Sequence, residues 1–382
     1  MAIYDISPTW QTEVKNKARG GIPTCDNSSI STDLVAWNKI KTLLEKSQNN
    51  GTSFSQGIVS TYSLVYTTSM TYSGGVLAPN GDVHFIPRNA AVGQKISNIG
   101  VVSTYSLIYT SGAGVGAYGG GVLASNGDIH FVLFRGAVGQ KINSSGVVST
   151  YSLIYTNGSG AYIGGVLSSS GNIHFAPYGA TCGQQISSIG VVSTYSLLYT
   201  NSGGSYFGAI LAPNGDIHFL PYSADRGQKI NSSGVVSTYS LVYTAVTAYA
   251  GGVLTFNGDI HFIPRTATMG QKININGVVS TYSLIYTNSS GAYNGGVLSP
   301  NGDVHFIPSN STVGQKINSS GVVSTYSLTY TSSSGAYSGG ILSNNGDINF
   351  IPAAAAVGQK ISTLPAKPLN IGLCCSPFFN KL

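Results

Sequence analysis

Charged side chains are scarce in this chain of 382 residues. Asp, Glu, Lys and Arg together make up 8% of it, whereas roughly a quarter is usual in a soluble domain. The net charge of +6 comes from single cations spread along the chain, and no basic run is present. Because nucleic-acid binding requires clustered positive charge, we expect no nucleic-acid partner.

Cysteine and long apolar runs are also lacking. The four cysteines, Cys25, Cys182, Cys374 and Cys375, have neither the spacing of a metal site nor the density of a disulfide framework. The first residues contain no basic stretch followed by an apolar one, so we expect no signal peptide and synthesis in the cytoplasm. No run of about 18 apolar residues occurs, so we expect no membrane span. No cofactor-binding motif is present either, and we expect no cofactor.

Repetition is what the chain has in abundance. The segment GVVSTYSL, or a close variant, occurs seven times at intervals of about 44 residues, and the last repeat ends near Ser362. A period of this length is typical of propellers and solenoids. The seven copies begin at Gly57, Gly100, Gly146, Gly190, Gly234, Gly277 and Gly321.

Each repeat has the pattern of three or four antiparallel strands. In the third copy, residues 146–156 are rich in β-branched and aromatic side chains, which predicts a long strand with a bend near its middle. YIGGVL follows as a second strand, and then a two-residue turn that is Asn-Gly in six copies. Asn-Gly between apolar runs is a strong hairpin signal because its turn needs positive φ at both residues. DIHFIP and GQKI, or their variants, supply the remaining strands.

Small sheets at this period predict an all-β, seven-bladed β-propeller over residues 56–364. The alternative is an open β-solenoid or a fibre of stacked sheets. A solenoid needs atypical repeats at its ends, whereas the first and last copies here resemble the inner ones. The closed propeller is therefore favoured.

The two ends of the chain do not follow the repeat. Residues 1–55 form a predicted attachment segment with one helix at about 33–48, and the tail 365–382 is expected to pack on the propeller or to close it. Apolar residues at 3–4 spacing give this helix one apolar face. The helix either packs on its own propeller or attaches the protein to a partner, and its candidate attachment residues are Trp37, Ile40, Leu43 and Leu44.

Residues with catalytic chemistry almost all occupy repeated positions. An aspartate follows the turn glycine in six copies, but one carboxylate in each repeat does not provide the pair of carboxylates that acid–base catalysis uses. The sequence also offers no serine, histidine and aspartate outside the repeated positions that could act together in nucleophilic catalysis. We therefore expect no catalytic residue, no metal site and no enzyme, but structural histidines between blades and Asp–Lys pairs within them. The histidines are His84, His130, His174, His218, His261 and His305.

Two sets of residues are candidates for binding a ligand. A tyrosine precedes the double glycine, or its variant, in every copy, and the nearby loops carry residues that do not repeat. Variable loops on a rigid scaffold are a common way to build a binding surface, although neutral drift of the loops is an equally simple explanation. The first set is Tyr72, Tyr118, Tyr162, Tyr206, Tyr249, Tyr293 and Tyr337, and the second is Arg88, Arg135, Tyr178, Tyr222 and Arg265.

The unit GGVL-(A/S)-P-N-G-D-(I/V)-H-F-I-P resembles the APNG-K-I-Y-x-I-P repeat of proteins of phages, large DNA viruses and some bacteria and algae. The ending SPFFNKL is similar to the SPYFNK ending of that group. A non-secretory segment before a repetitive β-domain also resembles phage fibre and decoration proteins. The resemblance implies a virion structural protein on the particle surface, anchored to capsid or tail proteins through residues 1–55, with host-surface glycans as further partners. A free, lectin-like glycan-binding propeller is the alternative, and self-association of the chain is left open.

Overall fold

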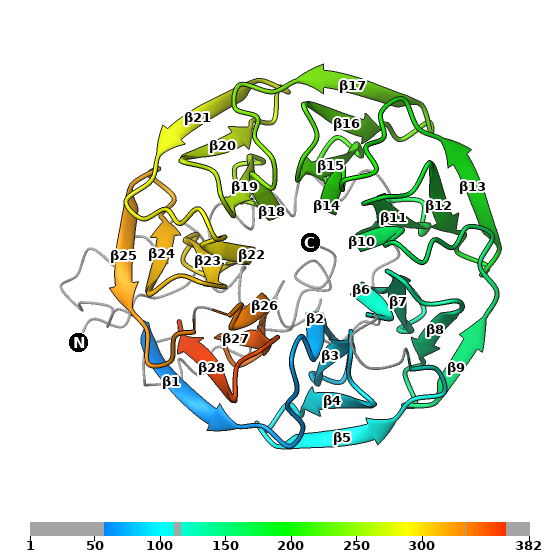
Figure 1. The fold of residues 1–382 in the computed structure, drawn as a ribbon, viewed down its shortest axis with the longest axis horizontal. Coiled ribbons are helices and arrows are strands. Elements are labelled where there is room, and N and C mark those ends of the chain that lie inside the picture. Colours follow the sequence, from blue (N-terminus) through cyan, green and yellow to red (C-terminus); the bar gives the residue numbers. More distant parts are fainter. Residues whose placement is uncertain (1–56, 111–115, 333, 364–382) are drawn as a thin grey trace, which may run out of the picture. The chain divides into compact units, whose positions relative to one another are not determined.

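Seven four-stranded antiparallel sheets form a closed ring in the computed structural model, which describes residues 57–110, 116–332 and 334–363 (Figure 1). Each sheet is one blade, and within the described residues there is no helix. The predicted seven-bladed, all-β propeller is confirmed, and the open array is excluded because the ring closes. The predicted helix at 33–48, its residues Trp37, Ile40, Leu43 and Leu44, and the tail 365–382 lie outside the described residues.

The two inner strands of each blade come from the YxGGVL and IHFIP segments. The innermost strands are β2 (Tyr72–Leu77), β6 (Tyr118–Leu123), β10 (Tyr162–Leu167), β14 (Tyr206–Leu211), β18 (Tyr249–Leu254), β22 (Tyr293–Leu298) and β26 (Tyr337–Leu342). The second strands are β3 (Val83–Pro87), β7 (Ile129–Leu133), β11 (Ile173–Pro177), β15 (Ile217–Pro221), β19 (Ile260–Pro264), β23 (Val304–Pro308) and β27 (Asp347–Pro352).

The two outer strands come from GQKI and GVVSTYSL. The third strands are β4 (Val92–Ile96), β8 (Gly139–Ile142), β12 (Cys182–Ile186), β16 (Arg226–Ile230), β20 (Met269–Ile273), β24 (Val313–Ile317) and β28 (Val357–Ser362). The outermost strands are β1 (Ile58–Ser63), β5 (Val102–Ser106), β9 (Val148–Tyr151), β13 (Val192–Ser196), β17 (Val236–Ser240), β21 (Val279–Ser283) and β25 (Val323–Ser327).

The ring is closed by its first strand. β1 pairs antiparallel with β28, with Ile58 opposite Ser362, and completes the sheet that β26 and β27 begin. The first copy of GVVSTYSL therefore forms the outermost strand of the last blade. Each other copy forms the outermost strand of the blade whose three inner strands come just before it in the chain. The closure joins the two ends of the repeat array with the same hydrogen bonds that hold any other blade together.

The outermost strands are shorter than predicted because the chain leaves the sheet to reach the next blade. Each has four to six residues, and the segment after it is held by a buried glutamine of the following blade. The side-chain Oε1 of Gln94 accepts the backbone N–H groups of Val65 and Tyr66 at 3.0 and 2.8 Å. The same pair of bonds recurs at all seven blades, where the glutamines are 0% exposed: Gln94, Gln140, Gln184, Gln228, Gln271, Gln315 and Gln359.

The tyrosine of GVVSTYSL covers the glycine of GQKI within one blade. Gly93 lies opposite Tyr105 in the pairing of β4 with β5, and a Cβ at Gly93 would lie 2.2 Å from the tyrosine ring. An aromatic ring packed over a glycine on the neighbouring strand compensates for the missing side chain. Both residues are therefore repeated because each requires the other.

A ring of glycines surrounds the axis where the innermost strands come closest together. The glycine two residues after each tyrosine has positive φ, at a β-bulge in the pairing of the two inner strands. A Cβ on Gly164 would lie 3.0 Å from the Cα of Gly208 in the next blade. The contact runs around the ring through Gly74, Gly120, Gly164, Gly208, Gly251, Gly295 and Gly339, so the double glycine sets how closely the blades approach.

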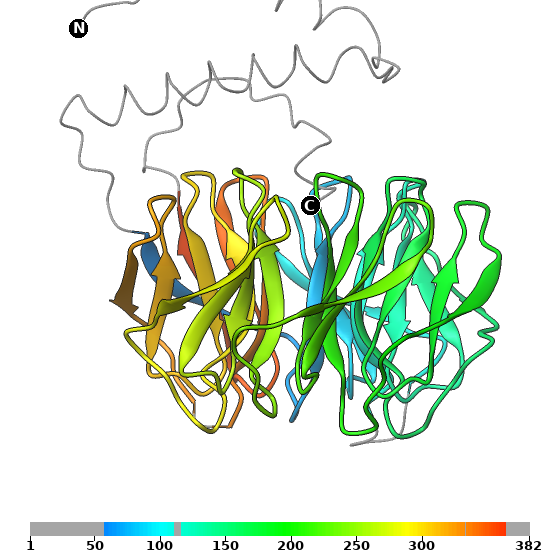
Figure 2. The ribbon, with the colours of Figure 1, turned by 90° about the horizontal axis from the view of Figure 1, so that it is seen from above.

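The two ends of the blades differ in what they carry. The Asn-Gly turns and the turns before the outermost strands lie at one end, which we call the hairpin face. The loops after the second strands and the connections between blades lie at the other end, the loop face (Figure 2). Because Ile58 pairs with Ser362, and Ser362 with Asp347 beside an Asn-Gly turn, the described propeller begins and ends at the hairpin face.

Gly164→Ala should destabilise the propeller more than Gly190→Ala. Both glycines have positive φ, at +71° and +86°, but only Gly164 has a neighbouring backbone within reach of the new methyl group. We expect Gly190→Ala to cost about 1 kcal/mol for the backbone conformation, and Gly164→Ala about 1–3 kcal/mol more because two blades must move apart. Urea unfolding measures both, and equal losses would contradict the role of the glycine ring.

Gln271→Leu should lower the free energy of unfolding by about 2–5 kcal/mol, since it leaves the N–H groups of Val242 and Tyr243 without an acceptor. Gln185→Leu is the matched control. Gln185 lies on the same kind of strand but is half-buried, and its amide donates only to the hydroxyl of Ser193. A loss at Gln271 no larger than that at Gln185 would show that the glutamine does not join the blades.

Candidate functional site

The seven tyrosines that precede the double glycines lie in the core, which corrects their assignment to ligand binding. Their side chains are at most 1% exposed. The ring of Tyr72 packs edge-on against Phe85 at 5.5 Å, and the hydroxyl of Tyr162 donates to the backbone carbonyl of Cys182 at 3.0 Å. They pack and hydrogen-bond within the blades and do not reach a surface: Tyr72, Tyr118, Tyr162, Tyr206, Tyr249, Tyr293 and Tyr337.

In five blades the histidine contacts a tyrosine of its own blade, which corrects the expectation that the histidines lie between blades. The Nδ1 of His130 lies 3.2 Å from the hydroxyl of Tyr151 on the outermost strand, and five blades share this contact. Burial lowers the pKa of all six histidines from 6.5 to about 4. Each imidazole is therefore neutral at neutral pH.

The predicted Asp–Lys pairs are confirmed. In six blades the lysine of GQK contacts the aspartate that follows the turn glycine at 2.5–2.7 Å. The third blade has Asn172 and Gln185 instead. In the part of the chain that the structure describes, no three His, Cys, Asp or Glu residues come together as metal ligands.

The unrepeated loop residues come together on the loop face. The residue after each second strand accepts, through its carbonyl, the N–H of the residue before the innermost strand of the next blade, as Arg88 does from Ala117 at 2.7 Å. We call this residue the ring position, because the bond recurs from blade to blade around the innermost strands. It is occupied by Arg88, Phe134, Tyr178, Tyr222, Arg265, Ser309 and Ala353.

Five consecutive ring positions make one continuous cluster. The guanidinium of Arg88 lies 4.6 Å from the centre of the Phe134 ring, and that of the adjacent Arg135 lies 4.9 Å from it. Phe134 contacts Tyr178 at 5.8 Å and Tyr178 contacts Tyr222 at 5.5 Å.

The guanidinium of Arg265 completes the row at 5.9 Å from the ring of Tyr222. Phe207 of the innermost strand β14 stacks on the same tyrosine at 5.6 Å. We name the following six residues the arginine–aromatic cluster: Arg88, Phe134, Arg135, Tyr178, Tyr222 and Arg265.

The cluster concentrates positive charge. Burial lowers the pKa of Arg88, and the charges of Arg135 and Arg265 lower it further, while the hydroxyls of Tyr178 and Tyr222 act the other way. The pKa of Tyr178 is raised by burial and then by Tyr222, against the effect of Arg88 and Arg265. The printed contacts run from Arg88 through Phe134, Tyr178 and Tyr222 to Arg265, so side chains of five consecutive blades lie in one row on the loop face.

Sequence analysis identified five of these six residues, because they do not repeat. It missed Phe134, which packs beneath two guanidiniums and is 3% exposed. A signal for it was present: the second blade ends its second strand in Leu133-Phe134, where the other six blades have proline followed by another residue. Blades six and seven carry Ser309 and Ala353 at the ring position and form the same sheets. The blade fold therefore does not require the large side chains of the cluster.

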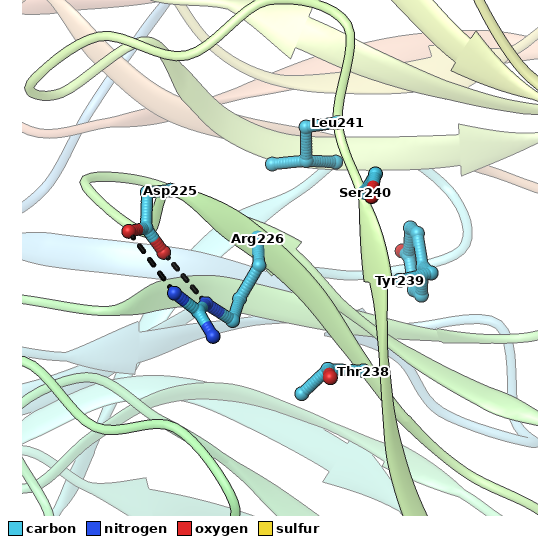
Figure 3. A pocket seen from close by; sticks show the side chains of 6 residues that line it. All are labelled: Asp225, Arg226, Thr238, Tyr239, Ser240 and Leu241. Carbon is cyan, nitrogen blue, oxygen red and sulfur yellow. Dashed lines mark hydrogen bonds and ion pairs between the residues drawn. The ribbon is translucent and has the colours of Figure 1, made fainter.

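One further polar feature breaks the repeat, on the fourth blade. Asp225 and Arg226 form an exposed ion pair at 2.8 Å, and the guanidinium lies 5.1 Å from the ring centre of Tyr199. The pair borders an open depression of about 450 Å³ that Thr238, Tyr239, Ser240 and Leu241 also line (Figure 3). An exposed pair of this kind contributes little to stability.

Neither a family model nor a curated protein matches the chain. Among solved structures, a streptogramin B lyase is similar with a TM-score of 0.69 and 19% identity, over 81% of this chain and 98% of its own. A catalytically inactive His-to-Ala variant of virginiamycin B lyase from Staphylococcus aureus, with quinupristin, has a TM-score of 0.69 and 16% identity, over 80% and 99%. The extracellular domain of a putative one component system from B. thetaiotaomicron has a TM-score of 0.60 and 10% identity, over 81% and 40%.

These similarities correct the expectation that the chain is not an enzyme. That expectation was based on the repetition of nearly every residue with catalytic chemistry. The streptogramin B lyases are enzymes, and they have the same fold as this chain. A propeller of this kind is therefore no argument against catalysis, and the exclusion is withdrawn. At 15–19% identity the likeness shows the fold and transfers no residue role.

The propeller should lose stability as the pH falls from 6.5 towards 4. The unfolded histidines take up protons near pH 6.5, whereas the folded ones resist until about pH 4, so protons favour the unfolded chain in this window. The full shift corresponds to roughly 3 kcal/mol per histidine. Urea unfolding at pH 7 and pH 5 measures the loss.

The matched variant carries asparagine at all six histidine positions, as Asn349 does naturally in the seventh blade. It should show a much smaller difference between pH 7 and pH 5. An unchanged difference would mean that other groups cause the acid sensitivity.

Proposed function

We propose that this protein is a virion structural protein, a fibre or decoration protein, whose propeller contacts the host surface through its loop face. The convergence of unrepeated residues in the arginine–aromatic cluster is the observation that supports a binding role. Five blades contribute to it, and the two blades without such residues fold in the same way. A rigid scaffold that presents unrepeated side chains in one place is suited to recognition.

The virion role is supported by the sequence motifs. The NGD-(I/V)-HFIP units and the SPFFNKL ending resemble repeat proteins of phages and large DNA viruses. On this proposal the protein is made in the host cytoplasm and resides on the particle surface, with capsid or tail proteins as partners of residues 1–55.

The path of the chain is consistent with attachment at one end of the propeller and ligand binding at the other. The described propeller begins at Ile58 and ends beyond Ser362, both on the hairpin face. The cluster lies at the opposite end of the blades, after the second strands. The point where the chain enters the propeller is therefore at the end of the blades opposite to the cluster.

A free, lectin-like propeller is the second candidate, and the same cluster favours it. The two candidates differ in whether the chain is found on particles. The chain shortened to residues 56–382 should keep the strand-rich circular dichroism of the full chain, because all strands of the seven blades lie within Ile58–Ser362. It should be absent from purified virions in which the full chain is present, as measured by quantitative mass spectrometry.

Equal incorporation of the shortened and full chains would show that residues 1–55 are not the anchor. Absence of the full chain from virions would reject the virion role and favour the free propeller. A variant carrying Trp37→Ala is a milder test, since it changes one predicted attachment residue and no residue of the seven described blades.

A further inference from the structure

We infer that the arginine–aromatic cluster binds an acidic saccharide, with one carboxylate or sulfate group held by the guanidiniums of Arg135 and Arg265 and the sugar ring against the tyrosines. This inference rests on the proposed binding role of the loop face and adds the chemical class of the ligand. Four observations carry it: the charge, the geometry of the donors, the confinement of the charge, and the polar surroundings.

The charges of Arg135 and Arg265 are not neutralised by the carboxylates of the described residues. All seven aspartates among these residues are engaged elsewhere, six with the repeat lysines and Asp225 with Arg226. Arg135 and Arg265 make no ion pair with a described residue. A negative group at this place would stabilise both guanidiniums and relieve their repulsion with Arg88.

The donors are held in fixed orientations. Guanidiniums that lie against aromatic rings keep their planar N–H edges available for an oxyanion, which they bind through two parallel hydrogen bonds. Arg265 lies against Tyr222, and Arg135 lies against Phe134. Tyr178 and Tyr222 are half-buried and lie between these arginines in the row, so they present hydroxyls and ring surface beside the cationic groups.

The charge is confined to one small area. In the described loops of the loop face, the other charged residues are Asp225 and Arg226, and these form their own pair. A nucleic acid uses a cationic track that follows several phosphates, which this face does not offer. One isolated acidic group fits the cluster better than a polyanion.

The surroundings favour a hydroxyl-rich ligand over an acidic peptide. The ring positions that continue from Arg265 are Ser309 and Ala353, and the residues next to them in the loops include Asn310 and Thr266. Small hydroxyl and amide side chains match the hydrogen-bonding groups of a sugar. Aromatic rings with a polar edge add flat contact area with little loss of side-chain entropy.

The test is binding of the full-length chain to an array of paired saccharides. Each sialylated or sulfated saccharide is printed beside its neutral parent, with a decathymidylate and a heptaglutamate peptide as acidic controls of other classes. We expect binding to a sialylated or a sulfated saccharide at least about tenfold above the neutral parent and above both controls. The two acidic series distinguish a carboxylate from a sulfate. Binding should weaken as salt is raised from low to physiological concentration.

Two variants and one control test the residues. Arg265→Ser and Arg135→Ser should each reduce the affinity for the acidic saccharide about tenfold or more and leave weak binding of the neutral parent unchanged. Serine occupies the equivalent positions at Ser309 and Ser223, so the blades accept it, and the urea midpoint should stay within a few per cent. Arg226→Ser removes the same charge outside the cluster and should change the affinity less than twofold.

Four results would overturn the inference: equal binding of acidic and neutral saccharides, no binding of any acidic saccharide, equal or stronger binding of the nucleotide or the peptide, or full binding by both arginine variants. These results are separate from the virion test. Acidic-saccharide binding by a chain absent from particles would reject the virion role alone, whereas a particle protein that binds only neutral sugars would reject this inference alone.

Discussion

A single buried glutamine in each blade holds the ring together. Its Oε1 accepts two backbone N–H groups from the segment that crosses from the preceding blade, at 2.7–3.1 Å. The crossing segment must leave one sheet before it enters the next, so its N–H groups have no strand partner, and burial without an acceptor would be costly. The glutamine supplies that acceptor in seven places, and β1 can then close the ring on β28 with ordinary strand pairing.

The other repeated residues act inside a blade or at the axis. The tyrosine of GVVSTYSL covers the glycine of GQKI, the histidine contacts that tyrosine, and the lysine pairs with the turn aspartate. The double glycine allows the innermost strands to approach each other. Because these contacts account for the residues that repeat, the residues that do not repeat stand apart. Comparison of the seven blades therefore separates the residues that the fold requires, which repeat, from the residues that it does not require, which vary.

Much of the fold was predictable because its signals are local. The Asn-Gly turns, the β-branched and aromatic residues of 146–156 and the period of about 44 residues predict short antiparallel strands and a ring. The placement of the first copy in the last blade was not predicted, because it is a pairing between residues about 300 apart, Ile58 and Ser362. The burial of Tyr72 and its equivalents was misjudged for a related reason: a tyrosine next to glycines looks exposed in the sequence, and only the neighbouring strands show that it is covered.

By itself the sequence determined the fold class, the number of blades and which residues depart from the repeat, because each of these depends on neighbours within one repeat period. Only the tertiary structure decided that Arg88, Phe134, Arg135, Tyr178, Tyr222 and Arg265 lie together. These residues are spread over 178 positions of the chain. They meet because ring closure brings the same loop of every blade to one face, where their charge and aromatic surface add up.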